Sequence, residues 1–458
     1  MKKIYKTLPH FIQNLLISIF NIYAYSKRHG GNYKKHLKNI NQNRFLSRVE
    51  LEKIQQKKFY ETVIKALKNS IYYQSIYSNI KNVYEIKNIT SLPIINKEDF
   101  RRNLKKIITD KKREGIKSKT GGTSGKAIEV IFTLDNIQER FAYLDNFRSQ
   151  YGYILGKKTA WFSGKDLLSK NDINKNRFWK TDYWYNVRYY STFHINKQYL
   201  EYYLKNLIQF KPEYLVGFPS SLLEIANYGI RKGYHFPEST IKAIFPTAET
   251  ITDEMKKKLE FFFKTKVYNQ YASSEGAPFI FECPNRNLHL ELQSGVYEVL
   301  DNDNNPTNYG RLVVTSFTTN GCPLIRYDIG DIIELSDEIC TCENKNPLVK
   351  SILGRTDDYI YSAENGKINL GNISNTLKDT KGIIQFQVIQ NFIESIEIQL
   401  VVDSLEYNSS IENIFLQNWR DRIGNKMNIE LKFVPEISRE NSGKFRMVKN
   451  NIKHLIDA

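Results

Sequence analysis

The sequence predicts an α/β protein with a large N-terminal domain of mixed sheets and helices and a small C-terminal α/β domain. Residues 199–271 alternate runs of helical and strand-like spacing, which is typical of a sheet covered by helices. Residues 295–317 place two alternating runs on either side of the turn-rich DNDNNPTNYG, which indicates an antiparallel hairpin. A compact unit of helix and strand patterns follows the segment GRTDDYI, so we predict domains of residues 1–356 and 357–458.

Periodicity and end signals place the elements along the chain. A strand is expected at 128–133, where Ile128, Val130 and Phe132 alternate with polar residues. Gly233 marks the end of one helix, and acidic residues in the first turn favour another in TDEMKKKLEFFFK. The expected helices are 199–210, 221–233, 252–264 and 410–424, and the further expected strands are 214–218, 241–245, 266–271, 396–403 and 429–434.

The composition indicates a globular, cytoplasmic protein. A chain of 458 residues with 41% hydrophobic content can bury a large core. Four cysteines are too few for a disulfide framework, which favours a reducing compartment. The net charge of +18 attracts anionic ligands, but no arginine-rich block, zinc-finger spacing or aromatic RNA-binding motif accompanies it. We therefore predict no specific nucleic-acid partner, and either a monomer or a homodimer.

Residues 1–40 are predicted to form a basic, amphipathic helical segment. The apolar stretch 11–25 contains polar residues and is shorter than the ~20 residues that cross a bilayer, and no small-residue cleavage site follows it. The stripe consists of Phe11, Leu15 and Ile19 with Ile12, Leu16 and Phe20 beside it, and the basic residues are Lys27, Arg28, Lys34 and Lys35. Two interpretations are open. The stripe packs on the protein's own core, or it makes peripheral contact with the inner face of a membrane.

The stretch SKTGGTSGKAIEVIFT, residues 118–133, contains a glycine-rich loop that suits phosphate. Its glycines let the backbone approach a ligand closely, and its Thr and Ser residues add hydroxyls. It is not a Walker A loop, because three residues rather than four separate Gly121 from Gly125, Ala127 follows Lys126, and a strand pattern comes next. A glycine-rich hairpin over phosphates fits better, and a surface turn without a ligand is the alternative.

Further segments combine glycine turns with charged residues. They are PTAET (246–250), YNQYASSEG (268–276), IRYDIGD (325–331), GRTDDYI (354–360) and ENSGKFRMVKN (440–450). In this order they resemble the adenylate-forming (AMP-binding, acyl-CoA synthetase) superfamily, in the phenylacetate-CoA ligase branch that includes the CapK-type proteins of capsular polysaccharide clusters. LPHFIQNLL, YYQSIYS, SLPIINKEDFRRN and LVGFPSSL also resemble that branch, so the resemblance runs almost end to end. It implies an N-terminal domain that holds ATP and an acid, and a mobile C-terminal lid.

The resemblance implies a role for each matching residue. The loop that holds the ATP phosphates is Thr120, Gly121, Gly122, Thr123, Ser124, Gly125 and Lys126, with Ala127 in place of a frequent proline. Around the base and ribose, Glu249 lies beside adenine, Tyr271 stacks on it, and Asp331 binds the ribose hydroxyls. Ser274 and Glu275 match the hydroxyl and the carboxylate of the YG.[TS]E motif of the superfamily. Glu275 is the implied Mg²⁺ ligand, and Ala272 stands in place of the usual glycine. Arg355 contacts phosphate, Asp357 is the hinge, and Lys444 is the catalytic lysine of the lid.

The implied activity is ATP-dependent activation of a carboxylic acid as an acyl-adenylate, with release of pyrophosphate. Coenzyme A is the default acceptor of the acyl group. Acyl or aminoacyl transfer to a sugar or amine during surface polysaccharide biosynthesis is the alternative, as the CapK-type resemblance suggests. A catalytically inactive membrane-surface scaffold is an alternative of another class, but Glu275, Asp331 and Lys444 argue against it, since such a scaffold has no need of all three.

Cysteines and one histidine form a candidate structural zinc set. Cys340 and Cys342 precede the predicted domain boundary, and CPNRNLH supplies Cys283 and His289. Three sulfurs and an imidazole suit a closed tetrahedral site, as some members of the branch carry. Because the spacing matches no standard zinc finger, free thiols are the equal alternative. Cys322 is assigned to the core.

Overall fold

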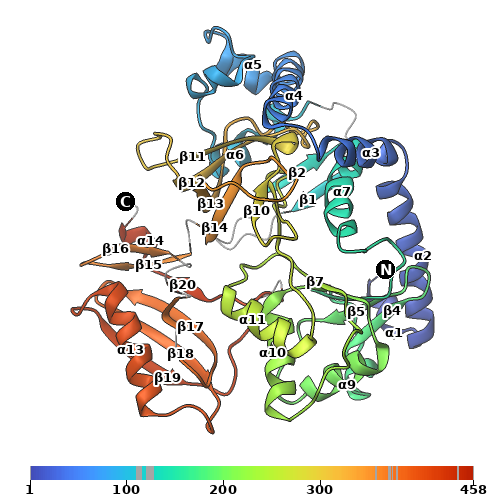
Figure 1. The fold of residues 1–458 in the computed structure, drawn as a ribbon, viewed down its shortest axis with the longest axis vertical. Coiled ribbons are helices and arrows are strands. Elements are labelled where there is room, and N and C mark those ends of the chain that lie inside the picture. Colours follow the sequence, from blue (N-terminus) through green and yellow to red (C-terminus); the bar gives the residue numbers. More distant parts are fainter. Residues whose placement is uncertain are drawn as a thin grey trace.

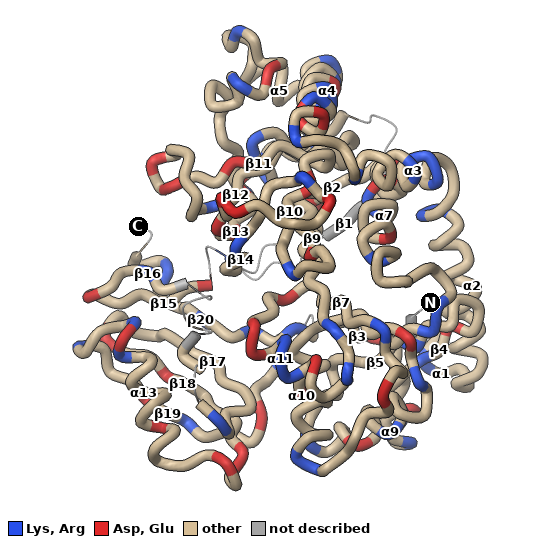
Figure 2. Tube along the Cα trace, viewed as in Figure 1, with Lys and Arg blue, Asp and Glu red and all other residues tan. Residues whose placement is uncertain are grey.

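The structure is a computed structural model that describes residues 2–109, 116–119, 128–355, 358–369, 373, 375–377, 380–440 and 443–456. A large N-terminal domain contains a seven-stranded and a five-stranded sheet, and a small C-terminal domain lies beside the latter (Figure 1). Lys and Arg residues are spread over both domains with acidic residues among them (Figure 2). This α/β architecture with a large and a small domain confirms the predicted fold class.

The five-stranded sheet has the order β4-β5-β3-β6-β7, in which β3 (Thr159–Ser163), β5 (Val187–Ser191), β6 (Tyr214–Gly217) and β7 (Ala243–Pro246) run parallel. The edge strand β4 (Trp179–Asp182) is antiparallel to β5. The predicted helices are α9 (Leu200–Phe210), α10 (Pro219–Arg231) and α11 (Asp253–Phe263), whose apolar faces share one core with this sheet. The alternating pattern of the sequence is therefore confirmed here.

The strand expected at 266–271 is wrong in its bounds. Val267 forms only an isolated bridge with Ile244, and the ladder of β8 covers Gln270–Ala272 in the other sheet. The chain crosses between the two sheets within this segment, so neither sheet can pair all of it. The segment therefore forms one bridge to the five-stranded sheet, through Val267, and one short strand of the seven-stranded sheet, β8.

The seven-stranded antiparallel sheet has the order β11-β12-β13-β14-β10-β9-β8. Its further strands are β9 (Phe279–Glu282), β10 (Leu288–Leu290), β11 (Gly295–Leu300), β12 (Tyr309–Ser316), β13 (Tyr327–Ser336) and β14 (Leu348–Arg355). The predicted hairpin is confirmed, since β11 and β12 pair from Gly295 with Ser316 to Leu300 with Arg311. The helices α4 (Arg48–Asn69), α5 (Ile71–Tyr77) and α6 (Lys97–Ile107) share the core of this sheet.

The predicted glycine-rich hairpin has its two strands in the structure. β1 (Ile116–Lys119) and β2 (Glu129–Phe132) pair antiparallel, and the register ends with Lys119 opposite Glu129. The helix α7 (Leu134–Ser149) follows β2 and begins with a capping box at Thr133. The loop between the two strands lies outside the described residues.

The C-terminal domain is a four-stranded sheet with one long helix. The order is β19-β18-β17-β20, with β17 (Ile383–Phe392), β18 (Ser395–Val402), β19 (Asn428–Phe433) and β20 (Val448–Asn450). The helix α13 (Ser409–Ile423) buries Phe415 and Trp419 against this sheet. Short elements complete the chain, namely α8 (Lys170–Asn174), the hairpin of β15 (Tyr359–Ser362) and β16 (Gly366–Asn369), and α14 (Lys453–Ile456).

The N-terminal segment is helical, with α1 (Lys2–Thr7), α2 (His10–His29) and α3 (Tyr33–Asn43). The core-packing interpretation of its apolar stripe is wrong, because Phe11, Leu15 and Ile19 are 67%, 54% and 54% exposed. The face of α2 that packs on the protein is mostly polar, since the adjoining surface carries buried charged groups that need partners. Within the described residues, no helix is both long and apolar enough to cross a membrane.

Candidate active site

The first group of predicted site residues lies together at the seven-stranded sheet. Asp331 in β13 pairs directly with Arg355 in β14, and Arg355 Nε is 3.9 Å from Asp331 Oδ1. The hydroxyl of Tyr271, in β8, donates a hydrogen bond to Asp331 Oδ2. Burial raises the pKa of Asp331, and the charge of Arg355 and the bond from Tyr271 oppose that shift. The structure thus brings together three residues that are distant in the sequence.

Glu275 belongs to the same electrostatic group. Its carboxylate is buried, and burial raises its pKa, while Arg355 opposes the shift and the negative charge of Asp331 adds to it. Carboxylate oxygens are preferred ligands of Mg²⁺, so the residue type fits a magnesium ligand. Ser274, its neighbour, has an exposed side chain.

Glu249 lies in the loop after β7 and holds the two domains together. Its Oε2 accepts a hydrogen bond from the backbone N–H of Ser220 at 3.1 Å, at the start of α10, and its Oε1 accepts one from the Ser220 hydroxyl at 3.1 Å. The backbone N–H of Phe445, in the C-terminal domain, donates to the same Oε1 at 3.0 Å. Burial raises the pKa of Glu249.

Gln270 connects the neighbourhoods of Glu249 and Tyr271. Its side-chain amide donates to the carbonyl of Pro246, the last residue of β7, at 3.2 Å. It also accepts a hydrogen bond from Arg148 Nε at 3.0 Å. The ends of β7 and β8 are thereby held side by side.

Lys444 lies in the segment 443–446, which docks on the N-terminal domain. Its carbonyl accepts a hydrogen bond from Glu440 N–H at 2.9 Å, and its neighbour Phe445 makes the contact with Glu249. Gly443 has a φ of 76°, and a Cβ atom there would lie 2.5 Å from Thr192 Oγ1. The backbone of this segment therefore lies directly against the N-terminal domain.

Sequence reasoning missed the side chains that fasten the two domains. Arg439, in the C-terminal domain, donates to Ser220 Oγ at 3.2 Å and to Ser221 Oγ at 3.3 Å, and it pairs with Glu224. Gln385, in β17, donates to Glu224 Oε1 at 2.9 Å. Ser220 and Ser221 belong to the LVGFPSSL stretch, so a sequence motif pointed to this part of the interface. Arg439 and Gln385 lie in no motif that would predict their contacts.

Two predicted parts of the site are not placed. The phosphate loop Thr120–Lys126 and the hinge Asp357 lie outside the described residues. The strands on either side of the loop are described, as is Asp358, whose carboxylate accepts a hydrogen bond from Arg446 at 3.3 Å.

The four proposed zinc ligands converge. One donor atom from each of Cys283, His289, Cys340 and Cys342 lies within 4.8 Å of every other. The Cys283 and Cys340 sulfurs are 3.7 Å apart, close to the about 3.8 Å that tetrahedral zinc–sulfur bonds require. His289 Nε2 is 3.3 Å from Cys342 Sγ, and its Nδ1 is 3.2 Å from the carbonyl of Asn346. An outer partner on Nδ1 that leaves Nε2 for the metal is typical of zinc-bound histidine. Cys322 is buried in the core, as predicted.

Comparison with known proteins places this geometry in a family. The CapK C-terminal domain model matches residues 360–451. Over 455 residues the chain is 33% identical to Protein CapK of Staphylococcus aureus, covering 98% of this chain and 99% of that protein. It is 31% identical over 163 residues to phenylacetate-coenzyme A ligase of Thermus thermophilus, and this alignment covers 34% of this chain and 37% of that protein. It is 25% identical over 333 residues to indoleacetate–lysine synthetase of Pseudomonas savastanoi, and this alignment covers 72% of this chain and 76% of that protein.

Solved structures show the same fold. The structure of 2-hydroxyisobutyryl-CoA ligase in the postadenylation state, in complex with R3-HIB-AMP, has a TM-score of 0.72 at 14% identity and covers 91% of this chain and 93% of that one. The same ligase in the thioesterification state, in complex with 2-HIB-AMP and CoA, has a TM-score of 0.58 at 15% identity. It also covers 91% of this chain and 93% of that one.

Fold and relatives together define an adenylate-forming enzyme. Within that class the chain belongs to the CapK family and is distantly related to phenylacetate-CoA ligases.

Proposed function

We propose that this protein uses ATP to convert a carboxylic acid into an acyl-adenylate and then transfers the acyl group to an acceptor. In the first step an oxygen of the acid forms a bond to the α-phosphorus, and pyrophosphate leaves with the electrons of the broken phosphorus–oxygen bond. In the second, a nucleophile forms a bond to the acyl carbon and AMP leaves. The first step concentrates negative charge on phosphoryl oxygens, so preorganised cationic groups and donors accelerate it.

The group at the seven-stranded sheet supports the nucleotide site. Asp331 would accept hydrogen bonds from the ribose hydroxyls, with its carboxylate held by Tyr271 and Arg355. The ring of Tyr271 would stack on adenine beside Glu249, while Arg355 and the loop of residues 120–126 would contact phosphate. Glu275 would hold Mg²⁺, which neutralises phosphate charge when bound.

The observation that carries the proposal is the docked segment 443–446. The backbone bond from Phe445 to Glu249 brings the residue after Lys444 to the proposed adenine side of the site. This contact supports a role for Lys444 at the site, because the segment that carries it is held by residues of both domains. The closer overlap with the postadenylation structure of the ligase supports a similar arrangement of the two domains.

Coenzyme A is our first candidate for the acceptor, because the acid–thiol ligases share this fold. An amine or sugar acceptor in capsular polysaccharide biosynthesis is the second candidate. The indoleacetate–lysine synthetase aligns with 72% of this chain, which keeps an amine acceptor as the alternative. None of the four cysteines forms a disulfide, which is in keeping with a reducing compartment for either reaction.

We also propose that Cys283, His289, Cys340 and Cys342 hold a structural zinc ion. Their donor atoms fit the ion in number, type and spacing. All four sites would be filled by protein ligands, so the metal would stabilise the fold rather than take part in the reaction.

Acid-dependent exchange of labelled pyrophosphate into ATP tests the proposed function. A panel of aromatic, aliphatic and amino acids is offered first, and each active acid is then tested with coenzyme A, amines and sugars. We expect at least one acid to support exchange and one acceptor to release AMP. Failure of every acid, with a folded protein that binds ATP, would favour the inactive scaffold.

A further inference from the structure

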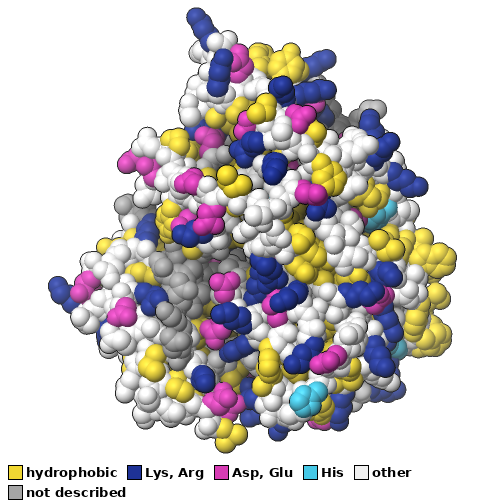
Figure 3. Space-filling view, in the orientation of Figure 1, with side chains coloured by type: hydrophobic (Ala, Val, Ile, Leu, Met, Phe, Trp, Pro, Cys, Tyr) yellow, Lys and Arg dark blue, Asp and Glu magenta, His cyan; other side chains and the backbone are white. Residues whose placement is uncertain are grey.

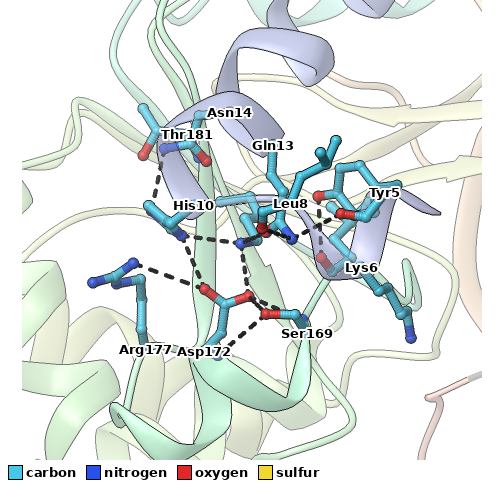
Figure 4. Close-up of polar contacts among 12 residues, drawn as sticks. Tyr5, Lys6, Leu8, His10, Gln13, Asn14, Ser169, Asp172, Arg177 and Thr181 are labelled. Atoms are coloured by element: carbon cyan, nitrogen blue, oxygen red, sulfur yellow. Dashed lines mark hydrogen bonds and ion pairs between the residues drawn. The ribbon is translucent and has the colours of Figure 1, made fainter. Parts of the chain in front are cut away.

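The helix α2 packs on the protein through polar side chains (Figure 4). Asn14 accepts a hydrogen bond from the backbone N–H of Thr181 at 3.1 Å. Asn21 donates to Asp182 Oδ2 at 2.7 Å, and Ser18 Oγ accepts from the backbone N–H of Tyr183 at 3.0 Å. The helix is thereby tied to the edge strand β4 and the turn that follows it.

A buried ion pair below the start of α2 fixes this orientation. Lys180, fully buried, lies 2.7 Å from Asp172 Oδ2. His10 Nδ1 lies 2.9 Å from Asp172 Oδ1 (Figure 4). Gln13 also accepts a hydrogen bond from Lys180. Turning α2 over would remove the contacts of His10 and Gln13 with this buried pair, and buried polar groups lose stability when such partners are lost. The polar face of the helix must therefore face inward.

The outward face of α2 is apolar as a consequence. It carries Phe11, Leu15, Leu16, Ile19, Phe20 and Tyr23, each between 40% and 67% exposed. The space-filling view shows hydrophobic side chains gathered at the right-hand edge of the molecule, where α2 lies (Figures 1 and 3). Soluble proteins rarely expose so many large apolar side chains on one helix without a partner.

Exposed aromatic residues also lie beside the helix α2. Tyr183 and Trp184, in the turn after β4, are 63% and 67% exposed. The Tyr183 hydroxyl accepts a hydrogen bond from Asn14 Nδ2 at 3.1 Å, so the turn is held against α2. Tyr and Trp are the residues that favour the boundary between lipid and water.

The charge of the N-terminal segment complements an anionic surface. Residues 1–49 contain ten Lys and Arg residues and no Asp or Glu, so they supply ten of the net +18 charges. Lys27 lies 4.4 Å from the centroid of the Tyr23 ring, at the end of the apolar face. Basic residues also lie above the apolar face on α3 (Figures 2 and 3). An amphipathic helix with these features is typical of binding in the plane of a membrane.

We propose that the outer face of α2 docks on a membrane that contains anionic phospholipid. The apolar side chains would enter the boundary between headgroups and acyl chains, Tyr183 and Trp184 would lie at that boundary, and Lys27, Lys34 and Lys35 would meet the headgroups. A second copy of the chain is disfavoured as the occupant, because it would bring the same excess of positive charge to both sides of the contact.

Co-sedimentation of the full chain with vesicles tests this proposal. Vesicles of phosphatidylcholine with phosphatidylglycerol should bind the protein, and pure phosphatidylcholine should bind it far less. Binding should weaken as salt rises, because the headgroup contacts are screened. The combined variant Leu15→Gln, Ile19→Gln and Phe20→Gln should weaken binding by at least about tenfold, since three exposed apolar side chains are lost.

Matched controls separate this face from a general stickiness of the protein. Phe261→Gln, Ile339→Gln and Leu405→Gln together remove three apolar side chains elsewhere that are 63%, 90% and 94% exposed, and should leave vesicle binding unchanged. Lys34→Gln with Lys35→Gln should weaken binding to anionic vesicles by about tenfold, whereas Lys81→Gln should not. Thermal melts and molar mass in solution are measured for each variant.

Three outcomes would overturn the proposal. The first is a folded wild-type protein that ignores anionic vesicles. The second is binding that survives the α2 substitutions. The third is a dimer that the α2 substitutions dissociate, which would assign the face to a second copy. None of these outcomes bears on acid-dependent pyrophosphate exchange, so the proposed function is tested independently.

Discussion

Asp331 is the residue on which the proposed ribose contact depends. It is buried, accepts a hydrogen bond from Tyr271, and lies 3.9 Å from Arg355. Burial raises the pKa of Asp331, and the positive charge of Arg355 opposes that shift.

Asp331→Ala should weaken ATP binding by roughly ten- to a hundredfold. Hydrogen bonds to a charged acceptor are worth ~1.5 to 3 kcal/mol, and the substitution removes the acceptor for both ribose hydroxyls. Equilibrium binding of ATP measures the effect, and Asp303→Ala, in an exposed turn, is the control. Unchanged affinity in a folded Asp331→Ala protein would place the ribose elsewhere.

The cysteine cluster makes a separate prediction at the scale of single residues. Purified protein should contain about one equivalent of zinc, and Cys340→Ser should lose the metal and lower the melting temperature. Cys322→Ala, which removes the thiol outside the cluster, should keep the metal. Metal analysis of the wild type decides the question, because a metal-free protein of full stability would show that the thiols are free.

Individual residues were predictable from the sequence where a local motif marked them. Tyr271, Glu275 and Asp331 each lie in a short glycine-containing segment, and the structure places them together. Arg439 and Gln385 were not predictable, since each acts through a contact more than 150 residues away. A single sequence does not record such long-range pairs.

At the scale of elements, the segment 443–446 is held by its backbone. The left-handed conformation of Gly443 and its close approach to Thr192 leave no room for a side chain. This element therefore tests whether docking of the C-terminal domain is needed for the first half-reaction.

Gly443→Ala should slow acid-dependent pyrophosphate exchange by at least about tenfold without unfolding the protein. The new Cβ atom would displace the segment from Thr192 and disturb the bond from Phe445 to Glu249. Gly366→Ala is the matched control, because Gly366 has a φ of 70° but open space around it. Equal effects of the two substitutions on exchange would mean that backbone strain alone is responsible.

Element prediction failed where packing overrides local pattern. The apolar stripe of α2 left both a buried and a lipid-facing helix open, because periodicity gives the direction of a stripe but not the surface it meets. The charged groups beneath α2, such as Asp172 and Lys180, determine the orientation and lie about 160 residues away. The strand predicted at 266–271 was also wrong in its bounds because of packing, since Val267 bridges to one sheet and Gln270 pairs in the other.

For the whole molecule, the two domains meet through a small set of polar contacts. Arg439, Gln385 and Phe445 of the C-terminal domain bond to residues of α10 and to Glu249. Polar contacts of this kind can be exchanged for water, so they suit a domain that takes up more than one position. The fold class and domain order followed from periodicity and motif order, whereas the contacts between the domains required the structure.

The half-reactions of Lys444→Ala test the central claim most directly. With Lys444 removed, the synthesis of adenylate from acid and ATP should fall by about ten²- to ten³-fold, since one charge contact in the transition state is lost. Because the lid is proposed to rotate about Asp357 for acyl transfer, the variant should still consume supplied acyl-adenylate with its acceptor at nearly the wild-type rate. Lys426→Ala, in an exposed turn of the same domain, should leave both rates unchanged. Equal loss of both half-reactions in a folded Lys444→Ala protein that still binds adenylate would contradict the account.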